Sequence, residues 1–159
     1  AELLTGLATF RGTGRRFELK GTVHGVRVID DYGHHPTEIH VTLEAARRYA
    51  DEGRLIVIFQ PHRYSRTKAF AAKFATELDL ADRAIVLEVY AASEKPIDGV
   101  SSRMITSMMS KGEYIPNFVE VTDSVIADAQ PGDVIVTLGA GDVSSLAPII
   151  VEGLSRRFN

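Results

Sequence analysis

The chain has 159 residues, 45% of them hydrophobic and 25% charged, which suits one globular domain with a buried core. With 18 basic and 21 acidic residues the net charge is -3, so no global positive field attracts nucleic acid or an anionic membrane, and no apolar run approaches the roughly 20 residues that cross a bilayer. Cysteine is absent, which excludes disulfides, thiolate metal sites and cysteine nucleophiles and is consistent with a cytoplasmic location.

The first part of the chain predicts a hairpin, a helix and a buried strand. Apolar and polar residues alternate at 17–23, and apolar residues cluster at 26–29. The two segments lie on either side of a His24-Gly25 turn, as expected of two antiparallel strands. A helix is expected to begin at Pro36, because apolar residues then recur on one helical face. The continuous apolar run 55–59 predicts a parallel strand covered on both faces, at the centre of the sheet.

The second part of the chain repeats the alternation of helix and strand, less clearly in its middle. The expected elements, in chain order, are a helix containing Phe70, Phe74 and Leu78, a strand at 84–87, a helix at 101–111, a short strand at 118–121, a helix at 123–129, a strand at 134–138 and a helix reaching Arg157. Between the last strand and the last helix lies the turn Gly139-Ala140-Gly141-Asp142.

Strands that alternate with helices imply a mainly parallel sheet with right-handed crossovers. We therefore predict a single α/β domain over residues 1–159, Rossmann-like and doubly wound, with an antiparallel hairpin at its start. Ligands of such folds collect beyond the carboxyl ends of the strands, here residues 30–35, 60–67, 88–94 and 139–142. The sequence begins at Ala1 with neither an initiator methionine nor a signal peptide, and reads like a cut inside a longer protein.

A first polar cluster, Asp30-Asp31-Tyr32-Gly33-His34-His35-Pro36, lies between a strand end and a helix start. Its carboxylates can accept hydrogen bonds from sugar hydroxyls, its phenol offers a stacking ring, and its imidazoles titrate near neutral pH. A plain structural account is that one aspartate caps the helix and one histidine completes a loop hydrogen bond. The whole cluster at a strand end favours a functional loop.

A second cluster, Gln60-Pro61-His62-Arg63-Tyr64-Ser65-Arg66-Thr67, follows the most apolar strand. If the helix has already begun, Arg63 and Arg66 share a helical face and can hold a carboxylate or phosphate at a positive helix N-terminus. The alternative is a solvated basic loop that pairs with surface acids. Its place beside the first cluster favours an anion site.

Two glycine-rich segments give weaker indications. In residues 12–18 two arginines precede a strand, where contact with a nucleotide phosphate and plain surface charge are equally good accounts. The turn at 139–142 lacks the third glycine of G-x-G-x-x-G, position 144 being Ser144, so a tight strand-to-helix turn is favoured. The sequence also lacks a G-x-x-x-x-G-K-[ST] phosphate loop, a nucleophile elbow and H-E-x-x-H spacing, and no metal site is predicted.

Four strings together carry a family resemblance. The chain closely resembles the C-terminal domain of the Mur ligases of peptidoglycan synthesis, and within them the branch that joins L-alanine to UDP-N-acetylmuramate, in Gly14-Arg15-Arg16-Phe17-Glu18, Asp30-Asp31-Tyr32-Gly33-His34-His35-Pro36-Thr37-Glu38, Phe59-Gln60-Pro61-His62-Arg63-Tyr64-Ser65-Arg66-Thr67 and Leu87-Glu88-Val89-Tyr90. The resemblance runs from about Gly12 to Gly99, returns at 134–142 and is weak between Met104 and Asp133.

The resemblance implies a three-domain enzyme that makes an amide bond. ATP would phosphorylate the muramoyl carboxylate, and the amine of L-alanine would attack the acyl phosphate, giving an amide, ADP and phosphate. The N-terminal domain would hold the UDP-sugar, and the central domain would hold the ATP phosphates and Mg²⁺. Both domains lie outside this chain, so neither cofactor is expected on the chain alone and the isolated chain is expected to be inactive.

The same resemblance implies roles for individual residues. Arg16 would contact the ATP phosphates, Asp31 the ribose, and Tyr32 would lie against the nucleotide. The amino-acid pocket would be lined by Tyr32, His34, His62, Arg63 and Arg66. His34 and His62 are both candidates for the catalytic base that takes the amine proton; a third alternative is that no protein base is needed.

Other functions remain open at this point. A recycling ligase that joins a ready-made murein peptide to the same UDP-sugar resembles this branch along much of the domain. A non-catalytic nucleotide-binding module and a metallohydrolase that uses histidine and aspartate belong to other classes. The preferred prediction is a ligase whose partners are its own two other domains and its small-molecule substrates. No nucleic-acid or membrane partner is expected.

Overall fold

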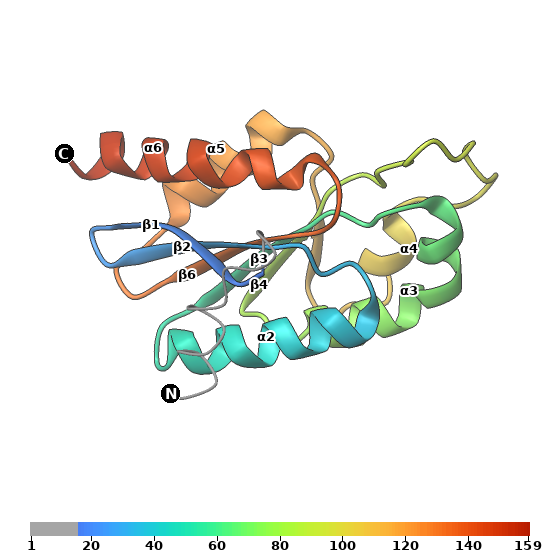
Figure 1. Cartoon of the computed structure of the whole chain (residues 1–159), viewed down its shortest axis with the longest axis horizontal. Helices are drawn as coiled ribbons and strands as arrows, with labels where there is room; N and C mark the ends of the chain where they lie inside the picture. The colour runs from blue at the N-terminus through green and yellow to red at the C-terminus, as the bar shows by residue number, and fades with distance from the viewer. Residues whose placement is uncertain (1–15) are drawn as a thin grey trace.

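The computed structural model describes residues 16–159, so the glycines and the arginine just before Arg16 lie outside the described part. Figure 1 shows a central sheet with helices on both of its faces. Within residues 16–159 no helix is both long and apolar enough to cross a membrane. The elements in chain order are β1 (Glu18–Val23), β2 (Val26–Asp31), α2 (Pro36–Ala50), β3 (Leu55–Phe59), α3 (Tyr64–Leu78), β4 (Arg83–Val86), α4 (Arg103–Thr106), β5 (Gly112–Tyr114), α5 (Phe118–Asp128), β6 (Val134–Leu138), η1 (Asp142–Ser145) and α6 (Leu146–Phe158).

The sheet confirms the predicted fold class. Its six strands lie in the order β1-β2-β6-β3-β4-β5. Strands β1 and β2 pair antiparallel, and each of the four other described strand pairs is parallel. The predicted hairpin, the helix that begins at Pro36 and the strand at 55–59 are all present, with β3 and β6 side by side in the middle of the sheet.

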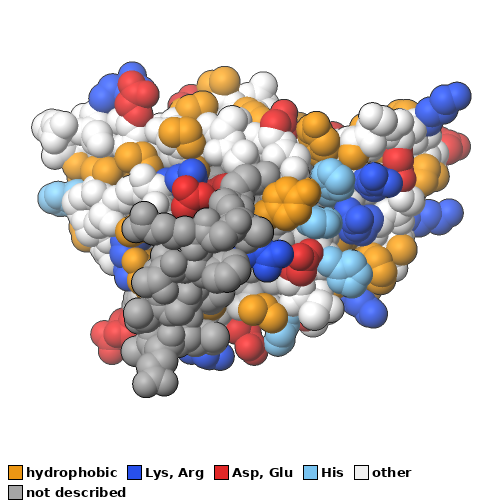
Figure 2. All heavy atoms as spheres, viewed as in Figure 1, with side chains coloured by type: hydrophobic (Ala, Val, Ile, Leu, Met, Phe, Trp, Pro, Cys, Tyr) orange, Lys and Arg blue, Asp and Glu red, His pale blue; other side chains and the backbone are white. Residues whose placement is uncertain are grey.

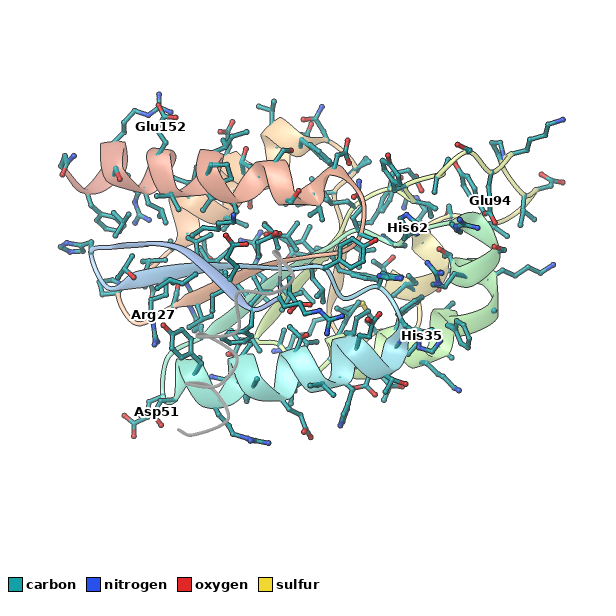
Figure 3. All side chains as sticks on the ribbon, in the orientation of Figure 1. Arg27, His35, Asp51, His62, Glu94 and Glu152 are labelled. Atoms are coloured by element: carbon teal, nitrogen blue, oxygen red, sulfur yellow. The ribbon has the colours of Figure 1, made fainter. Side chains whose placement is uncertain are left out.

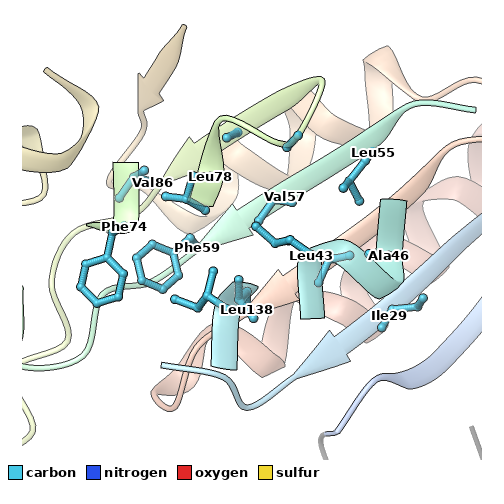
Figure 4. Close-up of a cluster of buried hydrophobic side chains, with 14 of the residues drawn as sticks. Ile29, Leu43, Ala46, Leu55, Val57, Phe59, Phe74, Leu78, Val86 and Leu138 are labelled. Carbon is cyan, nitrogen blue, oxygen red and sulfur yellow. The ribbon is translucent and has the colours of Figure 1, made fainter. Parts of the chain in front are cut away.

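Strand β3 shows why the sheet needs helices on both faces. Its five residues are fully buried. Leu55, Val57 and Phe59 face the cluster that contains α2 and α3, shown in Figure 4, whereas Ile56 and Ile58 face the cluster that contains α5 and α6. Each such side chain contributes about 1.5–3 kcal/mol by leaving water, so the continuous apolar run is stable only between two layers of helices.

The register of the parallel strands brings four strand ends to one edge. Leu138 at the end of β6 pairs with Asp31 at the end of β2 and with Phe59 at the end of β3, and Phe59 pairs with Val86 at the end of β4. The segments that follow these residues therefore start side by side. As predicted, the polar loops of the sequence lie at this carboxyl edge.

The weakly patterned region between β4 and β6 differs from the prediction. The predicted strand at 118–121 is wrong: these residues are the first turn of α5, because the Asn117 side chain caps the helix by accepting a hydrogen bond from the Glu120 amide (3.0 Å). Val121 and Val125 are both fully buried, which is helical spacing. The strand of this region is instead β5, and the helix expected at 101–111 is the four-residue α4.

Candidate functional site

Four aromatic rings from three separate loops form a row at the carboxyl edge. Tyr32 lies edge-on to His34 with 5.1 Å between the ring centroids, His34 lies 5.7 Å from His62, and His62 stacks on Tyr90 at 5.6 Å with an angle of 14° between the rings. Figure 3 shows His62 at this end of the sheet, and Figure 2 shows histidine and basic side chains gathered together on one side of the molecule. Three of the predicted residues thus meet, although their loops are far apart in the sequence.

Tyr90 was not among the predicted site residues, and it holds the position of His62. The Arg63 amide donates to the Tyr90 carbonyl (2.8 Å) and the Tyr90 amide donates to the Pro61 carbonyl (2.8 Å), so His62 and Tyr90 form a short parallel bridge beyond β3 and β4. This pairing places one ring on the other. Two signals pointed to it, since Tyr90 falls in the 88–94 segment that follows a strand and ends the string Leu87-Glu88-Val89-Tyr90 of the family resemblance.

Arg66 contacts His62 directly. Its Nη1 atom lies 3.1 Å from Nδ1 of His62 and donates to the His62 carbonyl (3.2 Å). Burial lowers the pKa of His62, and the charges of Arg66, of His34 when protonated, and of Arg63 lower it further. The lowered pKa favours the neutral form of His62.

Arg63 occupies a different position from the one that sequence spacing suggested. Helix α3 begins at Tyr64, and Arg63 precedes it as an exposed residue in the left-handed region (φ 73°). The condition for a shared helical face, that the helix has begun at Arg63, is not met. Arg66 contacts His62 from helix α3, whereas Arg63, in the loop before the helix, acts on His62 only through its charge.

The N-terminus of α3 is occupied by the chain's own carboxylate. Glu94 accepts a hydrogen bond from the Ser65 amide (3.1 Å) and a second from the Ser65 hydroxyl. A carboxylate at this position satisfies amide hydrogens that the first turn of a helix leaves unpaired. An external anion in this site would therefore be held by the arginine side chains and not by the helix N-terminus.

Glu94→Ala is expected to lower the thermal midpoint at about pH 7, with an effect that disappears on acidification. Hydrogen bonds from Ser65 hold the pKa of Glu94 below its usual 4.5. The ionised carboxylate thus stabilises the fold above its ordinary pKa, and this contribution is lost as the pH falls through the lowered pKa. Thermal melts from about pH 7 to about pH 3 measure the effect, and Glu152→Ala at an exposed position of α6 serves as the matched control. A difference that persists unchanged in acid would contradict the capping role.

Arg16, Asp31 and Tyr32, the three predicted nucleotide contacts, line one cavity of about 270 Å³ beside α2. Asp31 is 7% exposed, and its Oδ2 and Oδ1 atoms accept hydrogen bonds from the Phe17 amide (2.8 Å) and the Gly33 amide (2.7 Å). Burial raises the pKa of Asp31, and these two hydrogen bonds oppose the rise. The Thr42 side chain supplies a third hydrogen bond, so one of the four lone-pair sites of the carboxylate is left for a sugar hydroxyl. An anionic group could lie at Arg16, which lines the same cavity.

The turn at 139–142 is the tight strand-to-helix turn that the sequence favoured. Gln60, 4% exposed, donates to Oδ1 of Asp142 (2.7 Å) and accepts from the Val143 amide (3.1 Å). A Cβ atom on Gly141 would lie 2.5 Å from Oε1 of Gln60 and 2.6 Å from the Tyr90 ring. Glycine is needed here because Gln60 and Tyr90 both lie against the backbone and leave no room for a side chain.

The remaining histidines are dispersed over the surface. His24 stacks on Phe158 near the hairpin turn, His35 packs on Phe70, and His40 is paired with Glu77 at 2.6 Å. Among residues 16–159, no group of three or more histidine, cysteine, aspartate or glutamate side chains is placed to hold a metal ion.

Known proteins resemble this chain over nearly its whole length. A family model described as "Mur ligase, glutamate ligase domain" matches residues 15–141. The UDP-N-acetylmuramate–L-alanine ligase of Mycobacterium ulcerans is 54% identical over 160 residues, covering 98% of this chain and 33% of that protein. The corresponding ligase of Mycobacterium tuberculosis is 52% identical over 166 residues, covering 99% of this chain and 34% of that protein. The chain thus spans about a third of the length of these relatives.

Solved structures give the same result. The UDP-N-acetylmuramate-alanine ligase of Thermotoga maritima superposes with a TM-score of 0.74 at 30% identity, covering 93% of this chain and 31% of that one. A murein peptide ligase of Psychrobacter arcticus has a TM-score of 0.75 at 24% identity, covering 92% and 31%, which is a likeness of fold alone. From the match of the family model over most of its length, the chain belongs to the Mur ligase family.

Proposed function

We propose that this chain is the C-terminal domain of an ATP-dependent ligase that joins L-alanine to UDP-N-acetylmuramate in the cytoplasm. The observation that carries the proposal is the meeting of His34, His62 and Arg66 at one edge, beside the cavity of Asp31. The name borne by relatives more than 50% identical to the chain supports the choice of substrate. The absence of cysteine is consistent with a reducing compartment.

The cationic part of the site suits an amino-acid carboxylate. Arg66 contacts His62, and the charge of Arg63 also acts on His62. Two guanidinium groups can hold one carboxylate through forked N–H donors, which leaves the α-amine to be aimed by the neighbouring rings. Holding the amine at the correct distance and angle supplies much of the rate gain of such a reaction.

The cavity beside α2 suits part of the nucleotide. Asp31 would accept a hydrogen bond from a ribose hydroxyl, Arg16 would contact the phosphates, and the half-exposed Tyr32 ring would lie against the nucleotide. ATP would supply the phosphoryl group that activates the muramoyl carboxylate. Mg²⁺ and most of the phosphate contacts are assigned to the central domain, outside this chain.

A ligation assay with the intact protein tests the proposal. ATP-dependent formation of UDP-N-acetylmuramoyl-L-alanine is expected, whereas the 159-residue chain alone should form none, because it lacks a phosphate loop. Preference for a murein tripeptide over L-alanine would instead identify a recycling ligase. Tight ATP binding by the chain alone in calorimetry, with no ligation by the intact protein, would identify a nucleotide-binding module.

A further inference from the structure

We propose that His34 and His62 are held in opposite tautomers and divide the chemistry of the ligation between them. His34 takes a proton from the amine through its Nε2 atom, whereas His62 keeps the hydrogen on its Nε2 atom and donates it to the amino-acid carboxylate. The reaction named here rests on the proposed function. The tautomers themselves rest on contacts within the chain.

The backbone sets the tautomer of His34. Its Nδ1 atom lies 3.1 Å from the carbonyl oxygen of Tyr32. A carbonyl oxygen only accepts hydrogen bonds, so Nδ1 must carry the hydrogen, and the lone pair of the neutral ring is then on Nε2. Within the described part of the chain, Nε2 of His34 makes no hydrogen bond. In the proposed reaction this atom accepts a proton from the ligand.

A guanidinium sets the opposite tautomer of His62. Nη1 of Arg66 lies 3.1 Å from its Nδ1 atom. Arginine only donates, so Nδ1 of His62 must present its lone pair, and the hydrogen of the neutral ring is on Nε2. The second bond from Arg66 to the His62 carbonyl and the stacking on Tyr90 fix this orientation of the ring. The atom that His62 offers to a ligand is a donor.

The charged groups around the two rings favour the same division of roles as the tautomers. A proton added to His62 would turn Nδ1 into a donor facing Arg66, which breaks that hydrogen bond and places like charges together. A proton added to Nε2 of His34 leaves the bond from Nδ1 to the Tyr32 carbonyl intact, and Oε1 of Glu38 lies 3.7 Å from Nδ1 of the same ring. The ionisable groups facing the pair are Tyr32 and Glu38 from the β2–α2 segment, Arg63 and Arg66 from the α3 side, and Tyr90 and Glu94 from the loop after β4.

The proton balance follows from these assignments. The α-ammonium of the amino acid gives one proton to Nε2 of His34, and the freed electron pair forms the C–N bond at the acyl carbon. The C–O bond to phosphate breaks, the electron pair of this C–O bond leaves with the phosphate, and the phosphate takes up the second amine proton. His34 returns its proton to water. Throughout, the Nε2 hydrogen of His62 stays in place.

Two variants of the intact ligase separate the roles. In His34→Asn the side-chain amide can still donate to the Tyr32 carbonyl but offers no basic nitrogen, so kcat/KM for the amino acid is expected to fall by about 100-fold or more near pH 7. The loss should shrink at higher pH, where the free amine is already neutral. His62→Gln removes no proton acceptor from the reaction, so kcat should stay within about threefold of wild type. The loss of the ring that pairs with Arg66 and stacks on Tyr90 should raise the KM for the amino acid about 10-fold. His35→Gln, whose ring packs on Phe70, is the matched control.

Nitrogen-15 NMR of the histidine rings in the intact protein tests the tautomers without turnover. His34 is expected to show a protonated Nδ1 and an unprotonated Nε2, and His62 the reverse, with the two variants assigning the signals. Equal tautomers for the two rings, or a pH-dependent loss in His62→Gln that His34→Asn lacks, would overturn the inference. Failure of the wild-type protein to ligate L-alanine would refute the proposed function alone, since the ring signals are read independently.

Discussion

Arg66→Ala in the intact ligase is expected to raise the KM for the amino acid by about 100-fold, with a much smaller effect on the KM for ATP. A hydrogen bond to a charged group contributes about 1.5–3 kcal/mol. Under the proposed function Arg66 would donate to the carboxylate, and it also contacts His62 and orients its ring. The substitution removes both contributions of Arg66. Steady-state kinetics with L-alanine and with ATP as the varied substrate measure the two effects.

Two comparisons make the Arg66 result specific. Lys68→Ala removes the same charge from an exposed position on the same helix and should leave the KM for the amino acid within about twofold, because an exposed charge is screened. Arg63→Ala should also raise this KM above any effect on ATP. In Arg66→Ala the pKa of His62 should rise, since a cation that lowers it is gone. An unchanged KM for L-alanine would remove Arg66 from the amino-acid site.

Arg54→Ala is expected to cost about 3 kcal/mol of the free energy of unfolding. Arg54 holds both carboxylate oxygens of Asp133 (3.0 and 2.6 Å) and donates to the Asp128 carbonyl (2.9 Å) at the edge opposite the site. Asp133 is only 2% exposed. Without Arg54, its buried charge keeps a hydrogen bond from the Gln130 amide but loses its cation, and an unpaired buried charge is costly.

Urea unfolding of the chain measures this cost as a lower midpoint with an unchanged slope. Arg156→Ala supplies the contrast, because Arg156 and Glu152 form an ion pair at 3.5 Å whose side chains are 72% and 71% exposed. Exposed pairs of this kind contribute about 0–1 kcal/mol. If both variants lost the same free energy of unfolding, the burial of Asp133 would not explain how much its ion pair with Arg54 stabilises the fold.

Much of the fold of this chain could be predicted from local sequence patterns. The apolar run of β3 and β6, the alternation of the hairpin and the proline at the start of α2 each depend on near neighbours in the sequence, so they could be predicted without a tertiary structure. The prediction failed where residue type favoured one kind of element but capping and burial favoured another. Val119 and Val121 favour a strand by type, yet the Asn117 cap and the burial of Val121 and Val125 make the segment helical.

The sequence by itself determined the family resemblance, the fold class and the loops that hold the polar residues. Only the tertiary structure decided how those residues meet, because strand order and register bring together segments that lie far apart in the chain. The stacking of Tyr90 on His62, the carboxylate of Glu94 at the start of α3 and the left-handed backbone of Arg63 all arise in this way. The hydrogen-bond partners of His34 and His62 do so as well, and those partners set where each ring carries its proton.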